Sequence, residues 1–228
     1  MRTTCATPAS RRPGGARREA SASRWLAWYL SGMSAPAPIG TVDVAAYLAL
    51  EEGAATKHEY FRGAVHAMAG GTPEHGALAL ALASLLAVAL RGRPCRLFSS
   101  DVRIRVDETD LFTYPDLSVV CGALATAAID RNAITNPMVV VEVLSPGTEA
   151  YDRGAKMDHY RRLASLREYV LVNHDRHQIE VFRRNDAGRF EQFVFGAGEV
   201  VALASLGVTV DVDAVYEDPL ASNDGLAG

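Results

Sequence analysis

One glutamate in an otherwise apolar run limits what this chain can fold into. Residues 138–144 read Met-Val-Val-Val-Glu-Val-Leu, which is typical of a strand buried on both faces, and Ser145-Pro146-Gly147 ends it. An ionised carboxylate in such a strand costs several kcal/mol unless a cation meets it. Because strand side chains alternate, Glu142 shares its face with Val140 and Leu144. We therefore predict that this face opens near its end onto a polar cleft or a metal ion. The alternatives are an edge-strand glutamate facing solvent and a pair with an internal arginine.

A second acid, Asp116, follows Pro115 at the start of another apolar run, residues 115–120, which we predict to be a strand. If Asp116 and Glu142 emerge side by side from adjacent strands, they provide the oxygen ligands that Mg²⁺ or Mn²⁺ prefers. The alternative is an aspartate that only caps a turn.

A charged helix is predicted over residues 148–163, directly after the Glu142 strand. On this helix Asp152, Lys156 and Tyr160 repeat at i, i+4 and i+8, so they share one face. A helix that starts so soon after a strand must pack back on the sheet. Lys156 could then reach the carboxylates and stand as a positive charge beside a phosphate. The alternative is a solvated Asp–Lys pair.

The rest of the chain predicts strands around two or three helices. Helices are expected at 42–52, capped by Thr41, and at 73–90, started by Thr72 and Pro73; strands are expected at 58–61, 64–68, 95–106, 168–173, 178–183 and 190–195. Residues 58–68 predict a tight hairpin around Arg62-Gly63. This order mixes hairpins with a helical crossover, so we predict an α+β (α/β-like) domain, a mixed β-sheet flanked by helices.

Composition predicts one folded domain behind a basic leader. The 228 residues are 49% hydrophobic and 22% charged, enough apolar material for a core. Residues 1–32 instead hold six arginines against one acid, Glu19. We predict a disordered basic extension over residues 1–33 and a single domain over residues 34–228. The longest apolar run, residues 77–90, has fourteen residues, too few to span a bilayer, so no membrane partner is expected.

The predicted domain is acidic. Residues 33–228 carry 17 basic and 26 acidic side chains, a formal net charge of −9. Proteins that coat nucleic acid regardless of sequence normally present a basic surface. The charge therefore argues against tight nonspecific coating of DNA or RNA and leaves room only for a local basic groove.

The cysteines and histidines form no recognisable ligand motif. Cys5, Cys95 and Cys121 are too few and too far apart for a disulfide framework or a C-x-x-C site, so we expect reduced thiols and a cytoplasmic protein. The six histidines lack an H-x-x-x-H pair, which argues against zinc. His75, at the start of the long helix, is expected to be a hydrogen-bonded structural residue. The chain also lacks the glycine-rich loops of nucleotide-binding proteins.

Taken together, several segments carry a family pattern. They are Glu59-Tyr60-Phe61-Arg62-Gly63-Ala64-Val65, Met68, Gly70, Pro73-Glu74-His75, Ser100-Asp101-Val102-Arg103-Ile104, Pro115-Asp116, Val140-Val141-Glu142-Val143-Leu144-Ser145-Pro146, Asp152…Lys156…Tyr160 and Glu168-Tyr169-Val170-Leu171-Val172. Over about residues 40–200, the chain resembles the Uma-two family of restriction endonucleases, a branch of the PD-(D/E)XK nuclease superfamily.

The resemblance implies a restriction-endonuclease-like core in which Asp116 and Glu142 bind Mg²⁺ or Mn²⁺. The superfamily's usual lysine, two residues beyond the glutamate, is replaced by Leu144. The resemblance implies that Lys156, on the neighbouring helix, takes its place. Glu59 and Asp101 resemble further acidic positions of the family and are second-rank site residues.

Two positions depart from the family pattern. Arg62 stands where the hairpin often carries an acid, and Gly76 stands where asparagine often follows the histidine. Both positions concern the part of the protein expected to meet the substrate. Neither departure changes Asp116, Glu142 or Lys156. The main hypothesis is a metal-dependent endonuclease that hydrolyses DNA phosphodiester bonds as a homodimer. The alternative, favoured by the acidic charge, is a noncatalytic nuclease-fold module that binds a protein or nucleic-acid partner.

Overall fold

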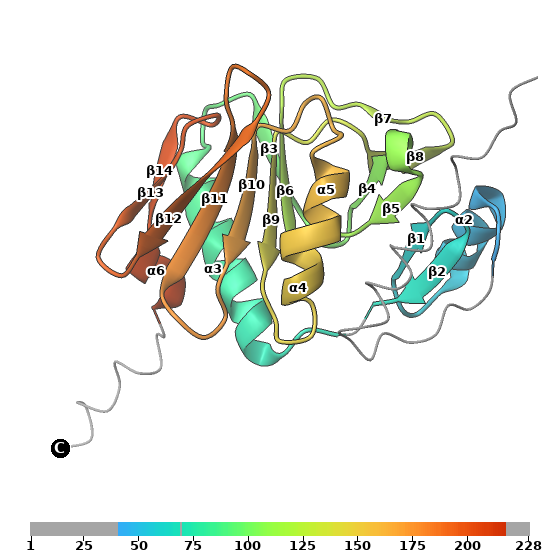
Figure 1. The fold of residues 1–228 in the computed structure, drawn as a ribbon, viewed down its shortest axis with the longest axis horizontal. Coiled ribbons are helices and arrows are strands. Elements are labelled where there is room, and N and C mark those ends of the chain that lie inside the picture. The colour runs from blue at the N-terminus through green and yellow to red at the C-terminus, as the bar shows by residue number, and fades with distance from the viewer. Residues whose placement is uncertain (1–40, 69, 218–228) are drawn as a thin grey trace, which may run out of the picture. The chain divides into compact units, whose positions relative to one another are not determined.

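The computed structural model describes residues 41–68 and 70–217, and a mixed six-stranded sheet forms their centre (Figure 1). Its strands are β3 (Cys95–Ser99), β6 (Leu117–Cys121), β9 (Val139–Val143), β10 (Glu168–Val172), β11 (Gln178–Arg184) and β12 (Phe190–Gly196). They are arranged in the order β12-β11-β10-β9-β6-β3. In this sheet β9 and β10 pair in parallel, and the other pairs are antiparallel. The mixed sheet confirms the predicted fold class.

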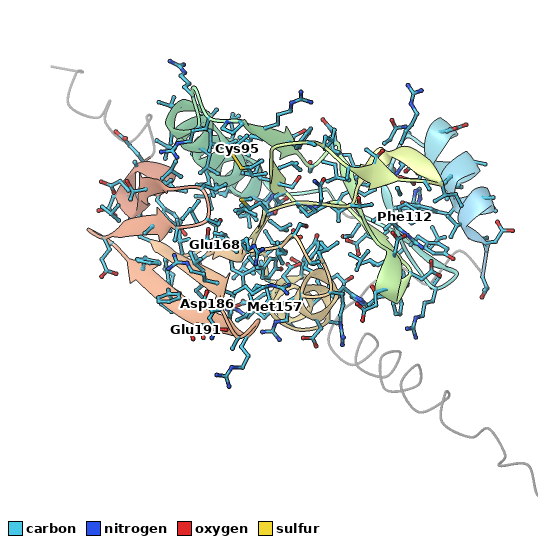
Figure 2. The ribbon with its side chains drawn as sticks, turned by 90° about the horizontal axis from the view of Figure 1, so that it is seen from above. Cys95, Phe112, Met157, Glu168, Asp186 and Glu191 are labelled. Carbon is cyan, nitrogen blue, oxygen red and sulfur yellow. A yellow bond between two sulfur atoms is a disulfide. The ribbon has the colours of Figure 1, made fainter. Side chains whose placement is uncertain are left out.

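A helical segment connects the parallel strands and covers one face of the central sheet (Figure 1). It consists of α4 (Glu149–Tyr151), a π-helical turn η2 (Asp152–Lys156) and α5 (Met157–Tyr160). Parallel neighbours require such a crossover. Met157, labelled in Figure 2, and Tyr160 pack in one core cluster with Val140 and Leu144. The predicted helix therefore does return onto the face that carries Glu142.

The opposite face of the central sheet is covered by the long helix and the C-terminal elements. These are α3 (Pro73–Ala89), the hairpin β13 (Val200–Leu203) and β14 (Val208–Asp211), and α6 (Val212–Tyr216). Leu82 and Leu86 of α3 pack in the cluster that contains Val141 and Val143. Thr72 caps α3 by accepting a hydrogen bond from the His75 backbone at 3.2 Å, which confirms the predicted helix start.

A second six-stranded sheet holds the N-terminal hairpin. Its strands are β1 (His58–Phe61), β2 (Ala64–Ala67), β4 (Arg103–Val106), β5 (Leu111–Thr113), β7 (Thr126–Ala127) and β8 (Asp130–Ile134). They are arranged in the order β2-β1-β5-β4-β8-β7. The helix α2 (Val44–Gly53) precedes β1 in the chain. Tyr47 of α2 packs on Tyr60 and Phe112, with ring centroids 5.2 and 5.3 Å away. Figure 2 labels Phe112 in this region. The predicted hairpin is confirmed, but Asp43, and not Thr41, caps α2.

The prediction of one strand over residues 95–106 is wrong. The run divides into β3, in the central sheet, and β4, in the second sheet, and a short 3₁₀ turn, η1 (Asp107–Thr109), follows β4. The break falls at Ser100 and Asp101, whose side chains favour turns, and regular alternation starts only at Val102. The predicted strand 115–120 likewise starts late, at Leu117.

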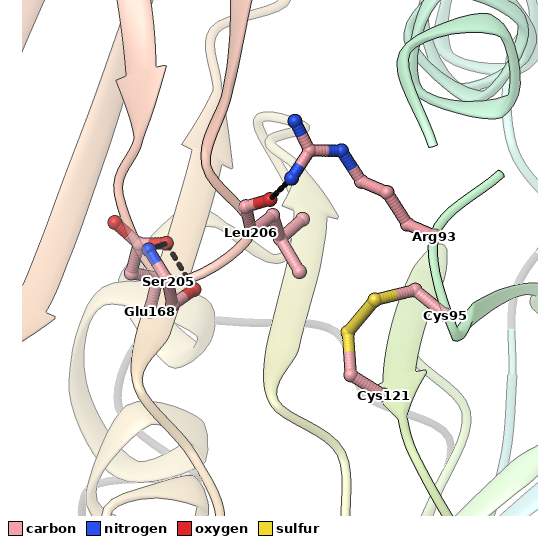
Figure 3. The surroundings of a disulfide bond; sticks show 6 residues. All are labelled: Arg93, Cys95, Cys121, Glu168, Ser205 and Leu206. Carbon is pink, nitrogen blue, oxygen red and sulfur yellow. Dashed lines mark hydrogen bonds between the residues drawn. A yellow bond between two sulfur atoms is a disulfide. The ribbon is translucent and has the colours of Figure 1, made fainter. Parts of the chain in front are cut away.

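The expectation of reduced thiols is also wrong for two of the three cysteines. Cys95 and Cys121 form a disulfide between β3 and β6 (Figure 3). The two residues are direct partners in the antiparallel register, although 26 positions separate them in sequence, so spacing alone does not reveal the pairing. Cys5 and the predicted extension over residues 1–33 lie outside the described residues. Within the described ranges, none of the helices is both long and apolar enough to cross a membrane.

Candidate active site

The register between β6 and β9 places the two predicted metal ligands opposite each other. Leu117 pairs with Val141, so Asp116, one residue before β6, lies across from Glu142. The Val143 backbone N–H donates to Asp116 Oδ2 at 2.7 Å and fixes the orientation of that carboxylate. Asp116 and Glu142 therefore emerge from adjacent strands, which is the arrangement that a two-carboxylate metal site requires.

Lys156 is the cation that meets the buried glutamate. Glu142 is only 3% exposed, and its Oε1 lies 2.9 Å from Lys156 Nζ and accepts a hydrogen bond from the Tyr160 hydroxyl, also at 2.9 Å. The same ammonium lies 3.5 Å from Asp152 Oδ1. Glu142 thus neither faces solvent nor pairs with an arginine, and Lys156 is buried, unlike a solvated surface lysine.

Glu59 joins this cluster from the second sheet. It lies on β1, and its Oε1 is 3.5 Å from Lys156 Nζ. Thr113 of β5 donates a hydrogen bond to Glu59, and Tyr151 of α4 donates another at 3.3 Å. One ammonium is therefore shared among three carboxylates, those of Glu142, Glu59 and Asp152.

His75 contacts the other predicted ligand. The N-terminal turn of α3 brings its Nε2 to 3.2 Å from Asp116 Oδ2. The hydrogen bond that His75 donates to the Asp116 carboxylate raises the pKa of His75. A Cβ added to Gly71 would lie 2.9 Å from His75 Nδ1, so the ring position depends on the absence of a side chain there. The sequence predicts a structural role for His75, and the structure places its ring beside Asp116.

Asp101 is not brought to this cluster. It lies in the exposed turn between β3 and β4, with its side chain 79% exposed. Its carboxylate accepts hydrogen bonds from Lys57 at 2.7 Å and from Ser99 at 3.3 Å. The ion pair with Lys57 lowers the pKa of Asp101. Of the five predicted site residues, Glu59, Asp116, Glu142 and Lys156 gather together, and Asp101 lies apart.

Burial and crowded charge determine the protonation of the cluster. Burial raises the pKa of Glu142, and the nearby Asp152 and Asp116 carboxylates raise it further against the attraction of Lys156. Burial also raises the pKa of Asp152. For Lys156, burial opposes the ammonium, but the combined attraction of Glu142, Tyr160, Glu59 and Asp152 outweighs it and raises the pKa. The cluster thus holds a charged lysine and more acids than that lysine can neutralise, so an added cation would be stabilised there.

The donor set fits a hydrated magnesium or manganese ion. Mg²⁺ commonly binds through one or two carboxylates and keeps several waters. Asp116 and Glu142 supply such a pair, and the described residues contain no preformed group of three or more acidic, histidine or cysteine ligands. Ser118 belongs to the same face of the sheet, two residues beyond Asp116, and its buried hydroxyl has no hydrogen-bond partner among the described residues.

Sequence reasoning found part of this site and missed the rest. The i, i+4, i+8 spacing already placed Asp152 and Tyr160 beside Lys156. Thr113 and Tyr151 carry no signal of their own, because their roles depend on how the second sheet meets the crossover helix.

Comparison with solved structures supports the fold. A crystal structure titled as a "putative nuclease belonging to DUF820" from Anabaena variabilis superposes with a TM-score of 0.63 at 18% sequence identity. The match covers 77% of this chain and 97% of that one. The two chains therefore share their fold, a mixed β-sheet flanked by helices.

Sequence comparison identifies the family. The profile of the Uma2 family, described as "Putative restriction endonuclease", matches residues 44–213, and the chain belongs to this family. The protein slr1290 of Synechocystis sp. is 37% identical over 186 residues, which are 80% of this chain and 95% of that protein. A second Synechocystis protein, sll1609, is 30% identical over 143 residues, 63% of this chain and 81% of its own length. The family resemblance seen in the sequence is confirmed, and it supports a nuclease function.

Proposed function

We propose that this protein is a metal-dependent endonuclease that hydrolyses DNA phosphodiester bonds. The observation that carries the proposal is the buried Glu142–Lys156 pair, placed directly across from Asp116 on the neighbouring strand. A carboxylate pair beside a lysine provides metal ligands and a positive charge, the two requirements of phosphodiester hydrolysis. The family description supports a nuclease.

In this proposal Asp116 and Glu142 hold Mg²⁺ or Mn²⁺. When bound, the ion would activate a water and stabilise charge on the phosphate. The Val143 N–H and Tyr160 hydroxyl keep the two carboxylates oriented. Glu59 shares the ammonium and fixes its position from the second sheet.

Lys156 would stabilise the negative charge that develops on the phosphate and orient the attacking water. Its raised pKa keeps it charged, which favours this electrostatic role over removal of a proton from water. Because burial raises the pKa of Glu142, a bound cation would favour the ionised form of this carboxyl.

The test is cleavage of supercoiled plasmid, linear duplex and single-stranded DNA with Mg²⁺ or Mn²⁺. The purified full chain should cut at least one of them, and Glu142→Ala and Asp116→Asn should not. Equal cleavage by wild type and Glu142→Ala would contradict the mechanism.

A second candidate is a noncatalytic module that binds a protein or nucleic acid, and the net charge of −9 over residues 33–228 favours it. Calorimetry separates the two functions. Binding of Mn²⁺ or Mg²⁺ at millimolar concentration, lost in Asp116→Asn, supports the nuclease. No heat of binding in the wild type supports the module.

We also propose a homodimer, because restriction-type cores often dimerise to cut both strands of a duplex. Light scattering at micromolar concentration should give twice the chain mass of 24.4 kDa, and a strictly monomeric mass would reject the dimer.

A cytoplasmic location is likewise proposed from the DNA substrate. The Cys95–Cys121 disulfide argues against this location, because cytosolic reductants usually keep thiols reduced. Alkylation of freshly lysed host cells followed by mass spectrometry should find both thiols modified if the protein is cytoplasmic. Protection of both thiols from alkylation would argue against that location.

A further inference from the structure

The helix that carries Lys156 contains an irregular turn. Residues 152–156 form a π turn between two short α-helical pieces. Each residue added to a helix turns the following side chains by about 100°, so a π turn changes which face they occupy. Such turns are rare and frequently lie at functional sites. Two contacts from outside the helix reach this turn.

The first contact involves a backbone carbonyl of the π turn. Tyr169 of β10 is fully buried, and its hydroxyl donates a hydrogen bond to the Asp152 carbonyl at 2.9 Å. This carbonyl belongs to the first residue of the turn. The start of the π turn is thereby tied to the central sheet.

A stronger contact is made by Arg153, the second residue of the turn. Its Nη1 and Nη2 donate to the two oxygens of Glu180 on β11, at 2.8 and 2.7 Å, and its Nε donates to Glu149 at 2.7 Å. Glu180 also accepts hydrogen bonds from Gln178 at 3.2 Å and Gln192 at 2.7 Å. The carboxylate is buried and fully satisfied, which is the geometry in which a bidentate arginine pair is strong and directional.

The strand registers place this contact in line with the active site. Glu180 pairs with Leu171, and Leu171 pairs with Glu142, so the three side chains form one row across β11, β10 and β9. Arg153 binds one end of the row and Lys156 binds the other. Two residues of the π turn, Arg153 and Lys156, therefore contact the sheet. They are three positions apart in the sequence.

We propose that Arg153 and Glu180 are positioning residues whose ion pair holds the π turn, and that this turn places the Lys156 ammonium between Glu142 and Glu59. Its consequence for cleavage rests on the proposed function. The position of Lys156 can be measured independently of activity.

The chain offers an unusually simple probe, because Lys57 and Lys156 are its two lysines. Protein labelled at lysine side chains should give one NMR signal from the partly exposed Lys57 and one from the buried Lys156. Arg153→Met and Glu180→Gln should both shift the Lys156 signal, because the ammonium would leave its place between Glu142 and Glu59. Lys57 pairs with Asp101 in another part of the molecule and should not change.

A matched control exists on the same sheet. Arg183 Nε lies 2.7 Å from Glu168 Oε1, and these residues pair across β10 and β11. Glu168 faces the C-terminal hairpin, where Ala204 and Ser205 donate to it (Figure 3 shows Glu168 and Ser205). Arg183→Met and Glu168→Gln should lower stability and leave the Lys156 signal in place.

If the proposal holds and the protein cuts DNA, Arg153→Met and Glu180→Gln should lower kcat by roughly 10–100-fold with little change in KM. An exchanged pair, Arg153→Glu with Glu180→Arg, should recover part of the loss. A folded Arg153→Met or Glu180→Gln with the wild-type Lys156 signal would overturn the proposal. Glu180→Gln keeps the shape of the side chain and decides the matter if Arg153→Met does not fold. A wild type without nuclease activity would refute the proposed function and leave the NMR result decisive here.

Discussion

Two buried glutamates lie on opposite faces of the central sheet, and their surroundings differ. Glu168 is fully buried beside one arginine, and two backbone N–H groups and the Ser205 hydroxyl satisfy its remaining lone pairs. Glu142 instead shares one lysine with two other acids. The first arrangement balances charge and hydrogen bonds, as structural ion pairs do. The second leaves negative charge in excess, which is the condition for binding a further cation.

The comparison predicts its largest effect on cleavage. Glu142→Gln should lower DNA cleavage by about 1,000-fold, because it removes a metal ligand and the partner of Lys156. Glu168→Gln, an identical change at a buried glutamate, should cleave as wild type does, with a lower melting temperature. Measured kcat/KM for both variants checks this. Similar losses in both would show that buried acids matter here only for stability.

Lys156→Ala should lower cleavage by about 100-fold while keeping Mn²⁺ affinity, since the lysine stabilises charge on the phosphate and is not a ligand. Lys156→Arg should rescue poorly, because a guanidinium has a different shape and five fixed donors. Calorimetry measures Mn²⁺ affinity and kinetics measures cleavage, so together they distinguish a metal ligand from a residue that stabilises charge on the phosphate. Wild-type cleavage by Lys156→Ala would reduce this lysine to a structural counter-ion.

The raised pKa of Glu142 predicts a pH dependence of stability. A carboxyl whose pKa is higher in the folded state binds more protons there, so the free energy of unfolding falls as pH rises from the ordinary pKa of glutamate to the raised value. The slope is at most about 1.4 kcal/mol per pH unit for one group. Urea unfolding at a series of pH values without metal should show this slope in wild type and a smaller slope in Glu142→Gln, in which buried Asp152 still has a raised pKa. The same slope in both proteins would assign it to other groups.

The smallest predicted effect concerns the loop before α3. Gly71→Ala places a Cβ 2.9 Å from His75 Nδ1, so the ring must shift away from Asp116 and Mn²⁺ affinity should fall severalfold. Gly70→Ala meets nothing within 4 Å and serves as the control. Equal affinities in the two variants would mean that His75 does not support Asp116.

The sequence was informative where one element carried its own signal. The apolar strand around Glu142 and the face shared by Asp152, Lys156 and Tyr160 are local patterns, and both led to the observed cluster. Contacts between distant elements were not predictable in this way. The pairing of Cys95 with Cys121 and the approach of Thr113 to Glu59 depend on strand registers.

Asp101 and the π turn show the same limit. Asp101 stands in a family-like strand pattern, but the chain turns there and passes to the other sheet, so its side chain faces solvent. The π turn has no distinct periodicity over so few residues, and its support comes from Glu180 on β11, 27 residues after Arg153. Helical spacing predicted the shared face of Lys156, and tertiary contacts determine its final position.

A crystal of the full chain soaked in Mn²⁺ tests the central claim most directly, because anomalous scattering locates the ion without reference to activity. The account predicts a manganese peak in contact with the carboxylates of Asp116 and Glu142, with Lys156 beside it and no ion at Glu168. A soaked crystal with manganese at neither Asp116 nor Glu142, or a bound ion that contacts neither carboxylate, would contradict it.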